Sequence, residues 1–202
     1  MKLYYSPGAC SLSPHIVANE IGIPLELEKV DTKTKQTEHG SDYLAINPKG
    51  YVPALRLDDG ALLTEGPAIV QYLADQKPGS GIAPANGTLA RYRLQEMLGY
   101  INSELHKTYS PLFNPNTTDA VRADREAYLR KRYALIEQTL SGQPFLLGDQ
   151  FSAADAYLFT VTNWARVLKL DLSEFPNLMA FQKRVAERPA VLGAMREEGL
   201  VK

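Results

Sequence analysis

The sequence contains one cysteine, no excess of either charge and no long apolar run, and each scarcity excludes a class of protein. A single cysteine cannot form an internal disulfide, and an unpaired thiol persists most easily in a reducing compartment, so we expect a cytoplasmic protein. The 22 basic and 23 acidic residues give a net charge of −1, which offers no electrostatic basis for binding nucleic acid or an anionic membrane. No segment is as apolar as a membrane span or a signal peptide, so we expect neither membrane insertion nor secretion.

Motifs for several common chemistries are also missing. The three histidines, His15, His39 and His106, have no metal-ligand spacing with Cys10. The sequence has no phosphate-binding loop, no G-x-G-x-x-G and no G-x-S-x-G. We therefore expect no metal centre, no bound nucleotide and no serine-hydrolase chemistry.

The chain divides into two segments with different hydrophobic periods. Over residues 1–80 short β-type runs alternate with short helical runs, whereas over residues 88–202 nearly every segment has a helical period. The stretch 77–87 is rich in proline and glycine and is typical of a linker. We predict an α+β N-terminal domain over 1–80 and an all-α helical bundle over 88–202.

The N-terminal domain is predicted to contain a mixed four-stranded sheet. A β-α-β unit at its start implies a parallel pair with a right-handed crossover. Asp59-Gly60 between two apolar runs is typical of a hairpin. The predicted strands are 2–5, 25–30, 51–57 and 61–63, and the predicted helices are 13–22, 41–46, 67–75, 88–109, 119–140, 152–168 and 177–187.

Cys10 is the first candidate for chemistry, because it lies where the first strand turns into a helix. Unpaired N–H groups at a helix N-terminus favour an anion, so a thiol there loses its proton more easily. The competing interpretation is an inert core cysteine, which is the usual state of an unpaired thiol. The position favours the reactive interpretation.

A strand and a helix are each expected to begin at the same edge of the sheet as Cys10. A cis bond at Val52-Pro53 would offer the backbone of Val52 to an extended peptide-like ligand, although a trans proline on an edge strand is more common. Glu65 and Gly66 precede a helix, where the Gly66 N–H can bind a carboxylate and the Glu65 side chain an ammonium group. An α-amino acid head group carries both charges, while an ordinary helix cap is the alternative.

His106 ends the long helix predicted at 88–109. Its ring could donate to a thiolate or polarise a substrate, although a solvated helix face is the default there.

Several stretches together resemble the beta-class bacterial glutathione S-transferases. They are MKLYYSPGACSLSPHI, NPKGYVPAL, LTEGPAIVQYLAD, SELHK, SPLFNP, LLGDQFSAADAYLF and ERPAV. The resemblance runs from end to end and implies a thioredoxin-like N-terminal domain that binds glutathione as co-substrate. It also implies an all-helical C-terminal domain that contributes the electrophile pocket and dimer contacts, and a homodimer whose active site lies between domains at the subunit interface.

The resemblance assigns individual roles. Cys10 contacts the glutathione sulfur and can form a mixed disulfide with it, Lys35 binds the glycyl carboxylate, and Val52 pairs with the cysteinyl backbone. Glu65 and Gly66 hold the γ-glutamyl end, and the segment from Ser103 to Leu105 reaches glutathione on the other subunit. The full set of glutathione-binding residues is Cys10, Lys35, Val52, Pro53, Glu65, Gly66, Ser103, Glu104, Leu105 and His106, and the catalytic ones are Cys10 and His106.

Two positions depart from related patterns. Gly99 stands where the family has an asparagine, so one side-chain hydrogen bond is lost. Ser13 replaces the second residue of a C-x-x-C motif, which excludes dithiol cycling but leaves monothiol exchange open. The hydroxyls of Tyr5 and Ser11 are rivals for holding the thiolate, with Ser11 ranked second to Cys10.

The implied function is conjugation of the glutathione thiolate to small hydrophobic electrophiles, in detoxification. We expect an apolar cleft lined by Phe113, Trp164 and Leu168. The alternatives are a glutathione-dependent thiol-disulfide reductase or reductive dehalogenase acting through a Cys10 mixed disulfide, and a non-catalytic ligand-binding or partner-binding protein. The sequence does not identify the electrophile.

Overall fold

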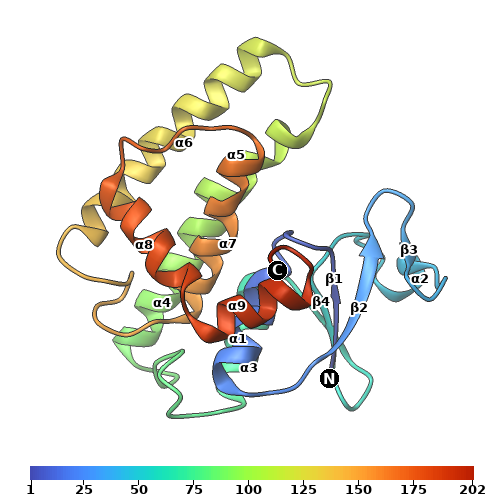
Figure 1. The fold of residues 1–202 in the computed structure, drawn as a ribbon. Helices are drawn as coiled ribbons and strands as arrows, with labels where there is room; N and C mark the ends of the chain where they lie inside the picture. Colours follow the sequence, from blue (N-terminus) through green and yellow to red (C-terminus); the bar gives the residue numbers. More distant parts are fainter. The chain divides into compact units, whose positions relative to one another are not determined.

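The chain folds into two compact units, and the computed structural model describes all residues from 1 to 202 (Figure 1). One unit comprises residues 1–83 together with 187–202, and the other comprises residues 84–186. The units change over at residues 83–84, and residues 187–202, which the predicted division places in the helical domain, lie in the first unit. Helix α9 (Pro189–Glu197) belongs to the first unit, because it packs along α1 (Leu12–Ile21) and buries Val191 and Ala194.

The first unit has the predicted thioredoxin-like α+β organisation, with one more strand than expected. The sheet order is β3-β2-β1-β4-β5, with β1 parallel to β2 and the other neighbours antiparallel. The additional strand is β3, only two residues long, which pairs with the edge of β2 inside a segment too polar to show a β pattern. The strands are β1 (Lys2–Tyr5), β2 (Glu26–Asp31), β3 (Gln36–Thr37), β4 (Ala54–Arg56) and β5 (Leu62–Thr64).

Helices α1, α2 and α3, together with α9, complete this unit around the central strand β1, which buries Leu3, Tyr4 and Tyr5. Helix α1 ends at Gly22, whose φ of 68° in the left-handed region suits a residue without a Cβ. Helix α3 (Gly66–Asp75) packs against α1 and against β4 and β5, with Ile69, Val70 and Leu73 buried. The short α2 (Tyr43–Ile46) is capped by the side chain of Asp42.

The second unit is all-helical, as predicted, but the helix expected over 88–109 is not regular. Helix α4 (Leu89–Tyr100) runs into a π-helix, η1 (Ile101–His106), before α5 (Lys107–Tyr109) and the 3₁₀ helix η2 (Ser110–Phe113). In η1 the N–H of Lys107 reaches the carbonyl of Asn102, five residues back. Such π segments are frequent at functional sites, and this one carries several predicted site residues.

Helix α7 is the centre of the helical unit. The remaining helices are α6 (Asp119–Leu140), α7 (Ala153–Val167) and α8 (Pro176–Ala186). Nearly every residue of α7 is buried, and it contacts α4, η1 and α8. Its first turn has the predicted capping box, in which the Asp155 carboxylate accepts from the Ser152 N–H at 2.8 Å and from the Ser152 hydroxyl at 2.6 Å. The same carboxylate accepts the Leu146 N–H at 2.8 Å, so it also ties the preceding loop to the helix.

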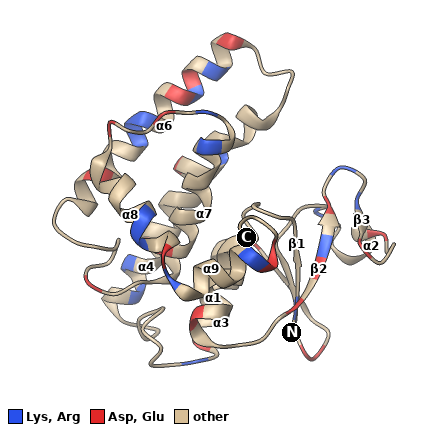
Figure 2. Ribbon diagram, in the orientation of Figure 1, with Lys and Arg blue, Asp and Glu red and all other residues tan.

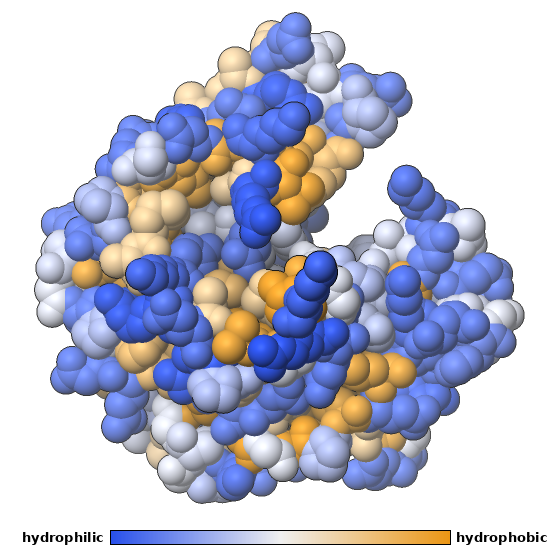
Figure 3. Space-filling view, in the orientation of Figure 1, coloured by the Kyte–Doolittle hydropathy of each residue, from blue (hydrophilic) through white to orange (hydrophobic).

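Charged and apolar groups are mixed on the exposed surface. Both signs of charge alternate along α6 (Figure 2), and hydrophobic groups reach the drawn face in separate places among hydrophilic ones (Figure 3). The exposed large hydrophobic side chains are Leu44, Tyr51, Leu89, Tyr92, Phe113, Val121, Leu135, Val167, Leu200 and Val201. None of the helices has the length and hydropathy required to span a bilayer.

Replacing Asp155 with alanine should lower the free energy of unfolding by about 2 kcal/mol, because two backbone N–H groups and a hydroxyl lose a buried acceptor. Urea unfolding at neutral pH measures the effect. Asp119→Ala is the matched control, because Asp119 is exposed in the first turn of α6 and should cost less than about 0.5 kcal/mol. Equal losses in the two variants would contradict the role given to the Asp155 contacts.

Candidate active site

Cys10 occupies the turn between β1 and α1, as the sequence predicted. Ser11 is the N-cap of α1, and the carbonyl of Cys10 accepts the Ser13 N–H at 3.2 Å and the Ser13 hydroxyl at 2.8 Å. The thiol points to the neighbouring segment and donates to the carbonyl of Val52 at 3.2 Å. The expected convergence of Cys10 and Val52 at one edge of the sheet is therefore present.

The protonation state expected for Cys10 is wrong. Part of the residue is exposed to solvent. Burial raises the pKa of its thiol by more than the hydrogen bonds from the N–H groups of Cys10 and Ser11 lower it, and the resulting pKa is about 12. The negative charges of Glu65 and Glu198 raise it further. At neutral pH Cys10 is therefore a neutral thiol that can donate a hydrogen bond, rather than a thiolate nucleophile.

The two hydroxyl candidates, Ser11 and Tyr5, are both buried. Ser11 is fully buried, and its hydroxyl bonds to the backbone of Ser6, accepting from the N–H at 3.1 Å and donating to the carbonyl at 3.2 Å. Burial raises the pKa of Tyr5. Cys10 is thus the better placed of the three candidates to meet a ligand sulfur.

The segment before Pro53 is held by side chains at three successive carbonyls. The carbonyl of Gly50 accepts a hydrogen bond from Lys35 Nζ at 2.6 Å. The carbonyl of Tyr51 accepts two, from Tyr43 Oη at 3.1 Å and from Asn47 Nδ2 at 2.8 Å. The carbonyl of Val52 accepts from the Cys10 thiol. The Val52–Pro53 peptide bond is cis. Because the carbonyl of Val52 accepts a hydrogen bond from the Cys10 thiol, the N–H of Val52 is the backbone group that remains to pair with a ligand.

Lys35 lies beside the segment that precedes Pro53. Its φ of 59° is in the left-handed region. Its backbone N–H donates to the carbonyl of Asp31 at the end of β2, and its carbonyl accepts the N–H of Tyr43 at the start of α2. The Nζ contact to Gly50 places the ammonium group beside the segment that leads to Val52.

Glu65 is the N-cap of α3 and has a strained backbone conformation. Its φ of 73° and ψ of 114° are rare for a residue with a side chain, and such strain is concentrated at functional sites. Its carbonyl accepts the N–H groups of Ala68 and Ile69, while its carboxylate pairs with Lys49 Nζ at 2.5 Å. The Lys49 ammonium also donates to Thr64 Oγ1 at 2.9 Å. Glu65 and Gly66 therefore bring an acceptor carboxylate and a helix N-terminus to one position.

Sequence reasoning missed a second support of the Cys10 turn. The buried Glu198, just after α9, accepts the Gly8 N–H at 2.9 Å and bonds to His15 Nδ1 at 3.1 Å, while His15 Nε2 lies 2.5 Å from Glu197. Burial lowers the pKa of His15, but the bonds to Glu198 and Glu197 outweigh it and the net pKa is raised. The carboxylates are remote in sequence from the turn, so no local pattern could have indicated them.

In the helical unit, His106 is built into an aromatic cluster. Its Nδ1 lies 2.6 Å from Tyr157 Oη, which donates to Asn102 Oδ1 at 2.9 Å. The Trp164 ring packs edge-on against the imidazole, with centroids 4.8 Å apart. Phe113 packs against Trp164 at 5.6 Å, and Leu168 is the half-buried C-cap of α7.

The predicted segment from Ser103 to Leu105 has three different environments. Ser103 is exposed, with its hydroxyl bonded to the Gly99 carbonyl at 3.0 Å. Glu104 accepts from Tyr128 Oη at 2.6 Å and pairs with Arg132 Nε at 2.8 Å. Leu105 is completely buried, so the contact expected of this residue would have to come from its backbone. Open space surrounds the position that a Cβ on Gly99 would take, so a side chain fits there.

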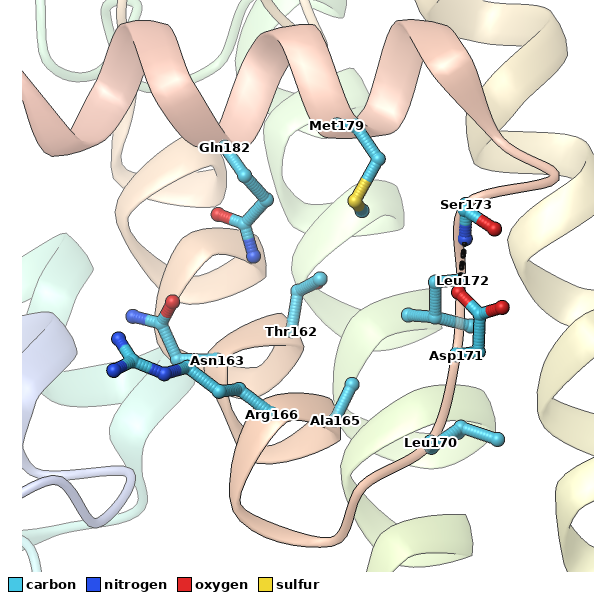
Figure 4. A pocket seen from close by; sticks show the side chains of 10 residues that line it. All are labelled: Thr162, Asn163, Ala165, Arg166, Leu170, Asp171, Leu172, Ser173, Met179 and Gln182. Carbon is cyan, nitrogen blue, oxygen red and sulfur yellow. Dashed lines mark hydrogen bonds between the residues drawn. The ribbon is translucent and has the colours of Figure 1, made fainter.

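A separate hollow of about 290 Å³ lies between α7, α8 and the loop that joins them (Figure 4). Its lining includes Thr162, Arg166, Met179 and Gln182, and none of the predicted site residues. No group of three or more His, Cys, Asp or Glu side chains is placed to hold a metal ion.

Comparison with known proteins agrees with this geometry. The family model described as Glutathione S-transferase, N-terminal domain, matches residues 8–76, and the one described as Glutathione S-transferase, C-terminal domain, matches residues 100–189. Glutathione S-transferase GstA of Escherichia coli O157:H7 is 47% identical over 200 residues, which cover 99% of this chain and 100% of that protein.

Two solved structures cover 100% of this chain and are themselves covered completely. A sphingomonad glutathione S-transferase complexed with glutathione has a TM-score of 0.95 at 46% identity, and the beta-class enzyme of Sphingomonas chungbukensis has a TM-score of 0.96 at 45% identity. A thioredoxin-like unit with this cysteine turn and cis-proline, followed by a helical unit, is the glutathione transferase fold. The chain belongs to the glutathione S-transferase family, and its resemblance to the beta-class members is confirmed.

The raised pKa of His15 predicts a pH-dependent contribution to stability. Because the folded pKa lies above the unfolded value of about 6.5, the contribution is complete below that value and is lost as pH rises through the folded pKa. The variant His15→Gln should therefore lose more unfolding free energy at pH 6 than at pH 9, as measured by urea unfolding. His39→Gln, at an exposed histidine, is the control for loss of an imidazole and should cost less unfolding free energy at pH 6 than His15→Gln does. A loss in His15→Gln that is the same at both pH values would contradict the ion-pair assignment.

The raised pKa of Cys10 predicts slow alkylation at neutral pH. The thiolate is the reactive form, so at pH 8 iodoacetamide should modify the folded chain at least about 100-fold more slowly than the urea-unfolded chain. The chain has no other cysteine, so mass spectrometry reports this site alone. A rate that rises with a midpoint near pH 8 in the folded protein would contradict the assignment.

Proposed function

We propose that this protein is a glutathione transferase that conjugates the glutathione thiolate to small hydrophobic electrophiles. The observation that carries the proposal is the contact between the Cys10 thiol and the carbonyl of Val52, next to a cis proline and in the same unit as the strained Glu65. This arrangement suits an extended peptide that ends in an α-amino acid head group. A relative 46% identical to this chain is complexed with glutathione, which supports the same ligand here.

The proposed contacts follow the chemistry of the tripeptide. The Val52 N–H pairs with the cysteinyl backbone, with the ring of Pro53 beside it. The Glu65 carboxylate accepts the α-ammonium group, and the Gly66 N–H at the start of α3 donates to the α-carboxylate. Lys35 supplies the cation for the glycyl carboxylate. Lys49, already paired with Glu65, adds a second positive charge close to the carboxylate-binding end.

The neutral state of Cys10 favours conjugation over thiol exchange. A thiol with a pKa of about 12 keeps its proton at neutral pH, and when glutathione binds, its S–H turns from the Val52 carbonyl to donate to the glutathione thiolate. A thiol-disulfide reductase would need a Cys10 thiolate as its nucleophile, and burial opposes that charge. Cys10 thus stabilises the anion on the co-substrate instead of carrying it.

The reaction proceeds in two steps. The glutathione thiol gives its proton to a base, for which we propose His106, and the thiolate then forms a C–S bond while the leaving group departs with its electron pair. Phe113, Trp164 and Leu168 provide apolar surface for the electrophile. Ser103 and Glu104 are proposed to contact glutathione bound to a second subunit of a cytoplasmic homodimer that acts in detoxification.

The decisive measurement is the pKa of bound glutathione, read from the ultraviolet absorbance of the thiolate. We expect it to fall at least about one unit below that of free glutathione, because the Cys10 S–H favours the anion. Conjugation of an activated chloronitrobenzene should accompany the shift. An unchanged thiol pKa would remove the proposed mechanism.

Paired variants test the assigned contacts. Glu65→Gln should weaken glutathione binding about 10-fold or more by calorimetry, whereas the control Glu26→Gln, an exposed acid on β2, should leave it unchanged. Cys10→Ala should raise the pKa of bound glutathione towards the free value and slow conjugation. If Cys10→Ala instead keeps full conjugation while glutathione-dependent disulfide reduction disappears, the reductase alternative is favoured. No binding of glutathione at all would favour a non-catalytic protein.

A further inference from the structure

The hollow between α7 and α8 is lined by none of the residues proposed to contact glutathione or the electrophile. All of its walls belong to the helical unit, and its volume is about 290 Å³. This volume is at the lower end of the range for ligand pockets. The hollow therefore suits a small molecule with one ring or a short chain.

The apolar walls of the hollow are held in place by the end of α7. Lys169 has a φ of 56° in the left-handed region, and the N–H of Leu170 bonds back to the carbonyl of Ala165 at 2.8 Å. This turn brings the buried side chains of Leu170 and Leu172 into the lining. Met179 of α8 adds its thioether to the same cavity (Figure 4). The apolar part of the hollow is thus formed without a ligand.

One buried polar atom of the lining residues has no hydrogen-bond partner. It is Oε1 of Gln182 on α8, whose Nε2 donates to the carbonyl of Phe159 at 3.4 Å. Exchanging the oxygen and nitrogen of this amide would set two acceptors against each other, so the contact with Phe159 fixes the orientation. A buried acceptor without a donor is unfavourable. A ligand with an O–H or N–H group would supply the missing donor.

A positive charge lies on the same side of the hollow as this oxygen. Asn163 and Arg166 are three residues apart on α7 and extend in the same direction, and the Gln182 oxygen turns to that side (Figure 4). No hydrogen bond joins these three side chains to one another (Figure 4). At the opposite end the Asp171 carboxylate accepts the Ser173 N–H at 2.9 Å. An amphipathic anion is therefore attracted to the Arg166 end and repelled from the Asp171 end.

We propose that this hollow binds a 2-hydroxy carboxylic acid with an apolar substituent. The carboxylate pairs with Arg166 and accepts from the amide of Asn163, while the 2-hydroxyl donates to Gln182 Oε1. The apolar substituent lies against Met179 and Leu172. A hydroxyl is a better donor here than an ammonium group, because Arg166 repels a second cation beside it. The site requires neither glutathione nor catalysis.

Binding of 3-phenyllactate to the full chain tests the proposal, with methionine methyl ¹³C spectra as the readout. The chain has four methionines, so each signal can be assigned by substitution with leucine. The Met179 signal should shift with a dissociation constant of about 1 mM or lower, as expected for a ligand of this size. The signals of Met97 on α4 and Met195 on α9 should not move. A Met179 signal that does not move at about 10 mM acid would overturn the proposal.

Variants and ligand analogues test the individual contacts. Gln182→Leu should weaken 3-phenyllactate about 10-fold but leave 3-phenylpropionate, which lacks the hydroxyl, unchanged. Arg166→Gln should weaken both acids about 10-fold, whereas Arg125→Gln, at an exposed arginine on α6, should weaken neither. Arg166 is exposed, so Arg166→Gln tests the site even if Gln182→Leu is destabilised.

Three results of these titrations would contradict the assigned contacts. One is equal affinity of the parent and Arg166→Gln for 3-phenyllactate, which would place the acid elsewhere. Another is a Gln182→Leu variant that loses as much affinity for 3-phenylpropionate as for 3-phenyllactate, because the hydroxyl would then have no role. The third is phenylalanine binding as tightly as 3-phenyllactate, which would overturn the choice of a hydroxyl donor.

Discussion

The site depends on the anchoring of one short stretch of backbone, residues 50–52. Each of its three carbonyls accepts a side-chain donor, from Lys35, from Tyr43 with Asn47, and from Cys10. Donors from three separate parts of the first unit therefore meet on a loop that has no strand partners of its own. A buried carbonyl without a partner is costly, so these contacts stabilise the loop and also fix where Cys10 points.

The anchoring explains why the cysteine behaves differently from a thiol at an open helix terminus. The turn before α1 does supply N–H groups that favour an anion, but the sulfur also faces a carbonyl and lies in the field of Glu65 and Glu198. Burial dominates, and the thiol stays protonated. A protonated thiol can donate a hydrogen bond to a negatively charged ligand atom.

The two units support their candidate site residues by different contacts. The first unit brings together backbone and charged groups that match a peptide, and it uses α9 and the following Glu198 to support the turn that carries Cys10. The helical unit surrounds His106 with aromatic rings and a pair of hydrogen bonds. In both units a buried polar group contacts a residue that is remote in sequence, Glu198 with Gly8 and His15 in the first unit and Tyr157 with His106 in the helical unit.

The sequence by itself determined the order of elements, the boundary near residue 80 and the capping box at Ser152, because these depend on local hydrophobic period and turn chemistry. It also indicated Cys10, Val52, Pro53, Glu65 and Gly66 through their positions at the starts of elements. Only the tertiary structure decided the packing of α9 on α1, the burial of Leu105, the π-helix within 88–109 and the protonation of Cys10. The reason is that burial and electric fields arise from contacts between residues far apart in the chain, which no local pattern records.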